Sequence, residues 1–450
     1  MIFRVLNRLA RREGLQQHVA ACVGAFTVAM LSVYPFVDSP MTLSSLNWEL
    51  QAISFAVASV ILGSSLSALV ALSFGATQRH WLRFLLPIVA LSIGLARTLD
   101  LRFVRFLSQY GDNESVRAYL NDGREFARWQ LGLTLLQEAH AFVNSFLFEI
   151  DTFQFARLTG ALLMALWGIW ILKRDTVSVA PWLLTSSPLW ILFSLGYDEY
   201  YPFVAGLTIA AAWSVFAPTP IFQRDTTYII VGLLPALYVG ALPVSVALMV
   251  RQWARESSSR ERSRGLIFAM VTLLIAIELG GELRGFVTKL SADMNLGQRD
   301  SASARSFLAD ASYVFSLRHL LDIWFWLVCS GALVAMIGTF AYARWRVRSQ
   351  TRYHSIIPLS QRLFEARAQT LLVVLAITFL IFMLPLLGPT RDIDLYFISM
   401  FVFLLLLVTR LDSIINDSAD PTNLRREILH VAAWGSAPVT TALVLFGVSR

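Results

Sequence analysis

The chain has 450 residues, of which 56% are hydrophobic and only 15% are charged, and its mean hydropathy is +0.61. A soluble domain carries charge on about a quarter of its residues, so this composition excludes an ordinary soluble protein and predicts a membrane protein. The basic excess (Lys+Arg 37, Asp+Glu 30) collects in no single patch and therefore does not predict a nucleic-acid partner.

Apolar stretches near the roughly 20 residues that a spanning helix needs alternate with short polar gaps. They lie at residues 16–37, 52–74, 83–98, 154–172, 180–196, 201–217, 265–282, 319–342, 370–387, 395–410 and 428–448. One further stretch, residues 226–250, contains Pro235, Gly240 and Pro243, which predicts a hairpin of two short helices. The predicted fold is all-α and polytopic, with about 13 transmembrane helices.

Basic residues orient these spans, because cytoplasmic loops carry an excess of Lys and Arg. Arg4 and the arginine-rich loops at 251–264 and 344–367 all fall inside if residues 226–250 form a hairpin. A single span there would put the first of these loops outside. The pattern predicts a multi-pass membrane protein, embedded among membrane lipids.

We expect a single transmembrane domain over the whole chain. Residues 1–98 hold the N-terminal spans, 99–150 form a long outer loop, and 151–450 hold the remaining spans. Apolar residues of the loop recur every three to six positions between Val116 and Leu136. This spacing predicts amphipathic helices on the bilayer surface.

Four polar gaps carry acidic clusters, and the threading places all four on the outer side. They are Gly111–Glu114, Tyr197–Tyr200, Glu278–Arg284 with Asp322 beyond it, and Arg391–Asp394. Carboxylates at mid-membrane are costly, so they are tolerated at the edges or in a water-filled cavity. Several spans that bring carboxylates to one rim predict one active site facing the periplasm or exterior.

The first two clusters differ in how well a structural role explains them. Asp112 follows a glycine and precedes surface-type helices, so it suits an N-cap as well as a catalytic base. Asp198 and Glu199 lie among three tyrosines between two apolar stretches. Interfacial aromatic residues explain the tyrosines, whereas the two adjacent acids favour function.

The other two clusters combine basic and acidic groups. Arg318-His319 with Asp322 suits either a phosphate site or an interfacial arginine beside a helix-start acid. Glu278 and Glu282, four residues apart, are explained by an interfacial ion pair with Arg284. A local Arg391–Asp392 pair is the structural alternative for the last cluster, where a functional role stays open.

These motifs, in this order, resemble a bacterial branch of the GT-C superfamily, which are polytopic glycosyltransferases that use polyprenyl-phosphate-linked sugars. The matching stretches are Gly111-Asp112, Gly196–Pro202, Ser316–Asp322 and Gly388–Leu395. They run from about residue 100 to 400, most of the chain. Two departures are that Ile393 stands where the last motif usually has Trp, and that the acid follows the third span rather than the first.

The resemblance implies that an acid in the long outer loop, Asp112, is the catalytic base, and we add Glu199 as a second catalytic candidate. It also implies that basic groups of other outer loops hold the donor phosphate. The candidates for this role are Arg284, Arg318, His319 and Arg391, and the remaining site residues are Asp198, Asp322, Asp392 and Asp394.

The predicted activity is inverting transfer of a sugar from a polyprenyl-phosphate donor to a hydroxyl of a glycan, lipid or protein acceptor. Two alternatives stay open: a transporter or flippase of lipid-linked glycans, and a glycan polymerase or ligase. No organic cofactor is implied. The long loop lacks a clear Asp-x-Asp motif, which argues against metal dependence, but a divalent metal stays open as a cofactor. Cys22 and Cys329 lie in apolar runs without metal-ligand spacing.

Overall fold

The computed structural model of the chain describes residues 18–30, 48–74, 80–98, 130–146, 149–174, 178–195, 201–216, 223–238, 241–256, 258–279, 316–317, 411–412, 414–416, 418 and 420–446. Every regular element in this part of the chain is a helix, which confirms the prediction of an all-α fold.

An N-terminal helix, His18–Met30, comes before the labelled elements. These are α2 (Trp48–Phe74), η2 (His80–Phe84), α3 (Leu85–Thr98), α5 (Gln130–Phe146), α6 (Thr152–Arg174), α7 (Ala180–Thr185), α8 (Pro188–Ser194), α9 (Tyr201–Phe216), α10 (Arg224–Leu237), α11 (Leu242–Arg255), α12 (Ser259–Glu278) and α19 (Pro421–Phe446).

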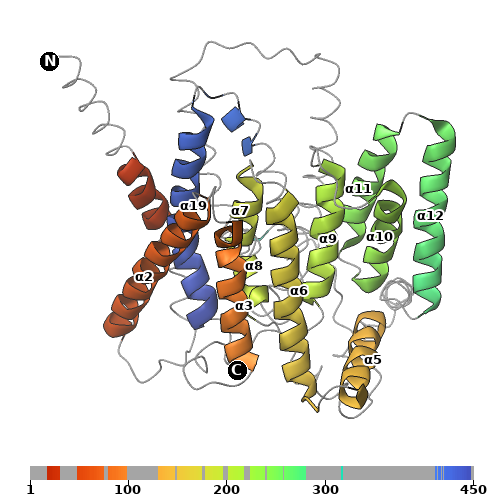
Figure 1. Cartoon of the computed structure of the whole chain (residues 1–450), viewed down its shortest axis with the longest axis horizontal. Helices are drawn as coiled ribbons and strands as arrows, with labels where there is room; N and C mark the ends of the chain where they lie inside the picture. Colours follow the sequence, from red (N-terminus) through yellow and green to blue (C-terminus); the bar gives the residue numbers. More distant parts are fainter. Residues whose placement is uncertain are drawn as a thin grey trace.

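The long helices stand side by side, with α2 and α19 at one end of the row and α12 at the other (Figure 1). α2 packs on α19, so the second predicted span lies against the last one. From there α3 packs on α6, α6 on α9, α9 on α10 and α10 on α12. α5 lies at one edge of the row and contacts α6 and α10.

The stretch predicted as one span over residues 180–196 is two short helices, α7 and α8. Ser187 has an extended backbone, and its side chain accepts a hydrogen bond from the Trp190 N–H at 3.3 Å. Pro188 then fills the first helical position, where a proline lacks no needed donor. Every side chain of both helices is buried, which is the setting in which a broken helix is tolerated within a membrane.

The predicted hairpin at residues 226–250 is confirmed. α10 ends at Leu237, Tyr238 is extended, and α11 begins with Pro243 near its N-terminus. The Arg224 Nη1 and Glu256 Oε2 atoms are 3.5 Å apart, so the start of α10 lies beside the end of α11. The two helices are therefore antiparallel, and both ends of the hairpin reach the same side.

α10 and α12 approach each other closely through small residues. A Cβ on Gly232 would meet the backbone of Ala269, and a Cβ on Gly265 would meet the ring of Tyr228. The contact residues lie four positions apart on each helix: Tyr228 and Gly232 on α10, and Gly265 and Ala269 on α12. Gly232 faces the backbone of α12, and Gly265 leaves room for the Tyr228 ring. Pairs of small residues at this spacing let helix backbones pack tightly within membranes.

The outer helices of the row expose large apolar side chains. Ile61 on α2 is 61% exposed and Ile267 on α12 is 59% exposed, and both belong to longer apolar faces. Among the described residues, two segments are long and apolar enough to cross a membrane, Ile53–Phe74 and Gln154–Lys173. The count of about 13 spans stays a prediction.

Candidate functional site

All the residues predicted to form the site lie outside the described residues. They are Asp112, Asp198, Glu199, Arg284, Arg318, His319, Asp322, Arg391, Asp392 and Asp394. The structure therefore does not test whether they come together. It does describe the helices that flank three of the four clusters.

The cluster at residues 196–200 connects α8 to α9, and the residues on both sides of it are buried. Leu195 is 5% exposed and Tyr201 is 0% exposed. The Tyr201 ring packs edge-on against the Tyr238 ring, with 5.7 Å between centroids. Because Tyr238 follows α10 directly, the tip of the α10–α11 hairpin supports the start of α9, next to Asp198 and Glu199 in the chain.

The long outer loop is described only in its last part, where α5 is fixed to the residues before α6. The His140 Nε2 atom donates to the Ile150 carbonyl at 2.8 Å, and the Ile150 N–H donates to the Asn144 Oδ1 atom at 3.0 Å. Leu136 packs with Phe155 in a buried cluster. The described part of the loop, which starts at Gln130, is thus firmly attached to the bundle.

A network of charged side chains joins three helix ends at the opposite side of the hairpin. The Arg224 guanidinium lies 2.7 Å from Glu261, 3.1 Å from Asp225 and 3.5 Å from Glu256. Arg264 bonds Asp225 at 2.5 Å. These contacts tie the start of α10 to the end of α11 and the start of α12.

Hydrogen bonds to Glu261 and Asp225 raise the pKa of the Arg224 guanidinium above its ordinary value, so it stays charged at any physiological pH. Three carboxylates surround the Arg224 guanidinium and contact its Nε and Nη1 atoms. The network is best explained as a clamp on the helix ends.

A second charged contact joins distant parts of the chain. The Asp412 carboxylate accepts hydrogen bonds from the Val179 N–H at 2.8 Å, from the Ala180 N–H at 3.2 Å and from the Ser178 hydroxyl. These N–H groups lie at the start of α7 and have no carbonyl partner within the helix. Asp412 thereby caps α7 from the segment just before α19.

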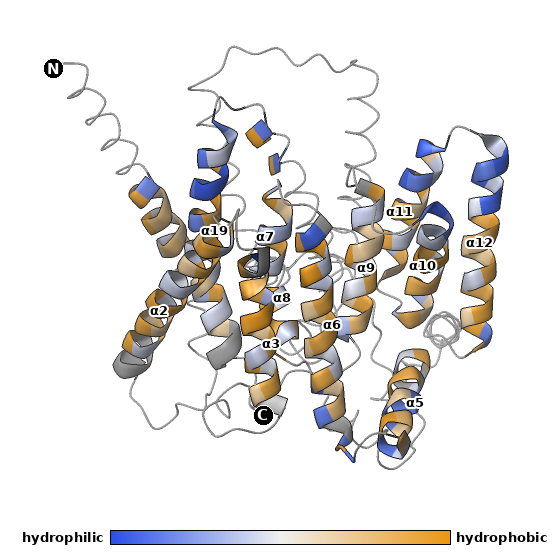
Figure 2. Cartoon of the chain, viewed as in Figure 1, coloured by the Kyte–Doolittle hydropathy of each residue, from blue (hydrophilic) through white to orange (hydrophobic). Residues whose placement is uncertain are grey.

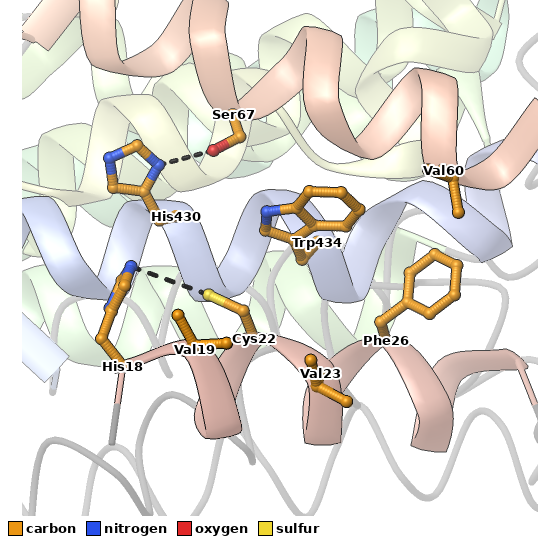
Figure 3. A pocket seen from close by; sticks show the side chains of 9 residues that line it. All are labelled: His18, Val19, Cys22, Val23, Phe26, Val60, Ser67, His430 and Trp434. Carbon is orange, nitrogen blue, oxygen red and sulfur yellow. Dashed lines mark hydrogen bonds between the residues drawn. The ribbon is translucent and has the colours of Figure 1, made fainter. Parts of the chain in front are cut away.

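Among the described residues, a cavity of about 400 Å³ lies between the N-terminal helix, α2 and α19. Figure 3 shows that His18 and His430 lie near one end and Phe26 near the other. The Ser67 Oγ and His430 Nδ1 atoms share a hydrogen bond of 2.5 Å. The Cys22 Sγ atom is 3.8 Å from His18 Nε2.

Sequence reasoning missed this cavity. Its polar residues are single His, Cys or Ser residues on three apolar helices, and no motif joins them. No group of three or more His, Cys, Asp or Glu residues that could hold a metal occurs within the described part of the chain. Metal use at the predicted site stays open.

Comparison with known proteins gives no match: no family model, curated protein or solved structure is significantly similar to this chain.

Proposed function

We propose that this chain is a polytopic membrane glycosyltransferase with about 13 spans. It transfers a sugar, with inversion, from a polyprenyl-phosphate donor to an acceptor hydroxyl on the outer face of a bacterial inner membrane. Asp112 acts as general base, with Glu199 as the second candidate. Arg318, His319, Arg391 and Arg284 bind the donor phosphate.

The observation that carries this proposal is that contacts between distant helix ends agree with the charge-based threading. The threading puts Arg224 and the 251–264 loop inside, and the ion pairs of Arg224 join these segments. It also puts residues near 178 and 412 inside, and the Asp412 cap joins them. These contacts support the alternation of spans from which the threading derives one common side, the outer rim, for all four acidic clusters.

The surface of the bundle supports insertion in a bilayer. Figure 2 shows hydrophilic residues at the upper ends of α19, α11 and α12 and a hydrophobic middle along α12. Exposed apolar side chains cover α2 and α12 at the two ends of the row. Faces of this kind are costly in water and favourable in lipid.

The proposed chemistry needs two kinds of group. A carboxylate removes the proton from the acceptor hydroxyl while its oxygen attacks the anomeric carbon. The bond from that carbon to the phosphate oxygen breaks, and polyprenyl phosphate leaves with the electron pair. Arginine suits the developing phosphate charge, because its fixed fork of donors matches phosphate oxygens.

The location of charge within the described helices favours an enzyme over a transporter. Transporters place ionisable residues near mid-membrane. α7, α8 and α9 contain no Asp, Glu, Lys or Arg. Their polar residues include Ser194 and Thr208, whose hydroxyls donate to carbonyls of their own helices at 2.7 and 2.8 Å. A polymerase or ligase of lipid-linked glycans would share these features and stays the second candidate.

The transfer assay uses purified full-length protein in nanodiscs, a panel of polyprenyl-phosphate monosaccharides, and mass spectrometry of products formed on envelope glycan fragments. We expect Asp112→Asn to lower transfer by roughly 10²-fold or more, the order for loss of a general base. Glu114→Gln, a neighbouring acid in the same loop, is the matched control and should keep activity. Transfer by Asp112→Asn within a few-fold of the unaltered protein would reject Asp112 as the base, and Glu199→Gln would be tested next.

Cysteine labelling tests the orientation separately, after Cys22 and Cys329 are replaced by Ala. Single cysteines at Ser258 and Ser355 should react only from the cytoplasmic side, and one at Asn113 only from outside. Labelling of Ser258→Cys from outside would overturn the threading.

A further inference from the structure

The cavity between the N-terminal helix, α2 and α19 runs from a polar end to an apolar end. His18, Cys22 and Phe26 follow one another on the N-terminal helix at one-turn intervals, and His430 and Trp434 do the same on α19. Phe26 and Trp434 pack edge-on with 5.8 Å between ring centroids. We call this cavity the N-terminal groove.

The groove opens to the surface of the protein. Two of its apolar lining residues are exposed, Val23 at 58% and Val60 at 45%. Its volume of about 400 Å³ falls within the roughly 300–1,000 Å³ of small-molecule sites.

A cation lies near the polar end. Arg426 is exposed on α19, one turn before His430 and on the same face, and it makes no ion pair with any other described residue. Its neighbour Glu427 is the nearby acid, and the Asn423 side-chain amide donates to it at 3.0 Å. An arginine beside two histidines suits a phosphate group at the membrane surface.

We propose that the N-terminal groove binds one acyl chain of an anionic phospholipid of the cytoplasmic leaflet, with its phosphate at Arg426, His18 and His430. The chain lies along Cys22, Trp434 and Phe26. This site rests on the proposed membrane orientation but not on glycosyl transfer. The lipid fills the space between the first and last helices of the described part.

Photocrosslinking tests the site. The full-length protein is placed in phosphatidylcholine vesicles with a minor fraction of phosphatidylglycerol that carries a diazirine on its acyl chain. Peptide mapping should find crosslinks at Val23, Val60 and Trp434. Val60→Trp fills the groove and should remove most of this labelling. Ile61→Trp, on the adjacent and more exposed position of α2, is the matched control and should label normally.

Arg426→Gln should weaken retention of phosphatidylglycerol by about tenfold, the usual effect of losing a charge-assisted hydrogen bond. Equal labelling by a phosphatidylcholine probe would overturn the anionic specificity. Equal losses in Val60→Trp and Ile61→Trp would overturn the groove itself. The two proposals can fail separately. If the crosslinks are absent but Asp112→Asn abolishes transfer, only the lipid site is rejected. If the crosslinks form but Asp112→Asn keeps full transfer, only the assigned catalytic base is rejected.

Discussion

Replacement of Gly232 by Ala should destabilise the protein, although alanine is the better helix former. The added Cβ would lie 2.9 Å from both the Ala269 Cα and carbonyl carbon, and closer still to the carbonyl oxygen. These are backbone atoms of α12, so no side-chain rotation can relieve the overlap. α10 and α12 must move apart, and the contact between Tyr228 and Gly265 must loosen with them.

The expected magnitude follows from two opposing terms. Overpacking a close contact costs about 1–3 kcal/mol, whereas alanine gains about 1 kcal/mol over glycine in helix propensity. Gly24→Ala isolates the second term, because a Cβ there meets no atom within 4 Å. The two variants should therefore differ by about 1–3 kcal/mol, or roughly 2–6 °C in thermal midpoint at about 2 °C per kcal/mol.

Intrinsic fluorescence of the 13 tryptophans during heating in detergent measures the midpoint. Gly265→Ala provides an intermediate case, because its obstacle is the ring of Tyr228, which can tilt. The expected order of midpoints is Gly24→Ala highest, then Gly265→Ala, then Gly232→Ala. If Gly232→Ala gained as much stability as Gly24→Ala, the close approach of α10 and α12 would be refuted.

Two further predictions concern Arg318 and Arg224. Arg318→Lys should bind polyprenyl-phosphate donor more weakly than the unaltered protein, and Arg318→Ala should lose about 1.5–3 kcal/mol of binding free energy; equal, undiminished affinity in native mass spectrometry would leave Arg318 as a membrane anchor. Arg224→Gln removes partly exposed ion pairs, which salt would otherwise screen. The thermal midpoint of this variant should therefore respond less to added salt than that of Arg260→Gln, a control on the exposed start of α12. Equal salt responses of the two variants would show that the ion pairs of Arg224 contribute nothing to stability.

The sequence predicted a helix break only where proline and glycine residues coincided with a charge pattern that required the chain to turn back. At residues 226–250, two prolines and a glycine coincided with arginines that a single span would misplace, and the hairpin followed. At Ser186–Pro188 a proline was also present, but no charge depended on it. The span was therefore predicted as continuous, because a proline at a helix start and one at a kink look alike in sequence.

Close helix packing was beyond the reach of the sequence for a different reason. Gly232 and Gly265 are each unremarkable in an apolar helix, and their effect appears only when Ala269 and Tyr228 lie opposite them. Such contacts depend on the rotation of two helices about their axes. The charge and hydropathy patterns that fix the order and direction of spans carry little information about that rotation.

The two candidate sites show what kind of pattern a sequence can reveal. The predicted catalytic residues form short runs in which several charged groups stand side by side, so each run is visible alone. The N-terminal groove takes His18 and Cys22 from the N-terminal helix, Ser67 from α2 and His430 from α19. Since α2 and α19 are consecutive neither in the sequence nor in the threading, only the fold brings Ser67 and His430 into hydrogen-bond contact. A site of that kind leaves no local motif, and its detection depends on the packing of the first helices against the last.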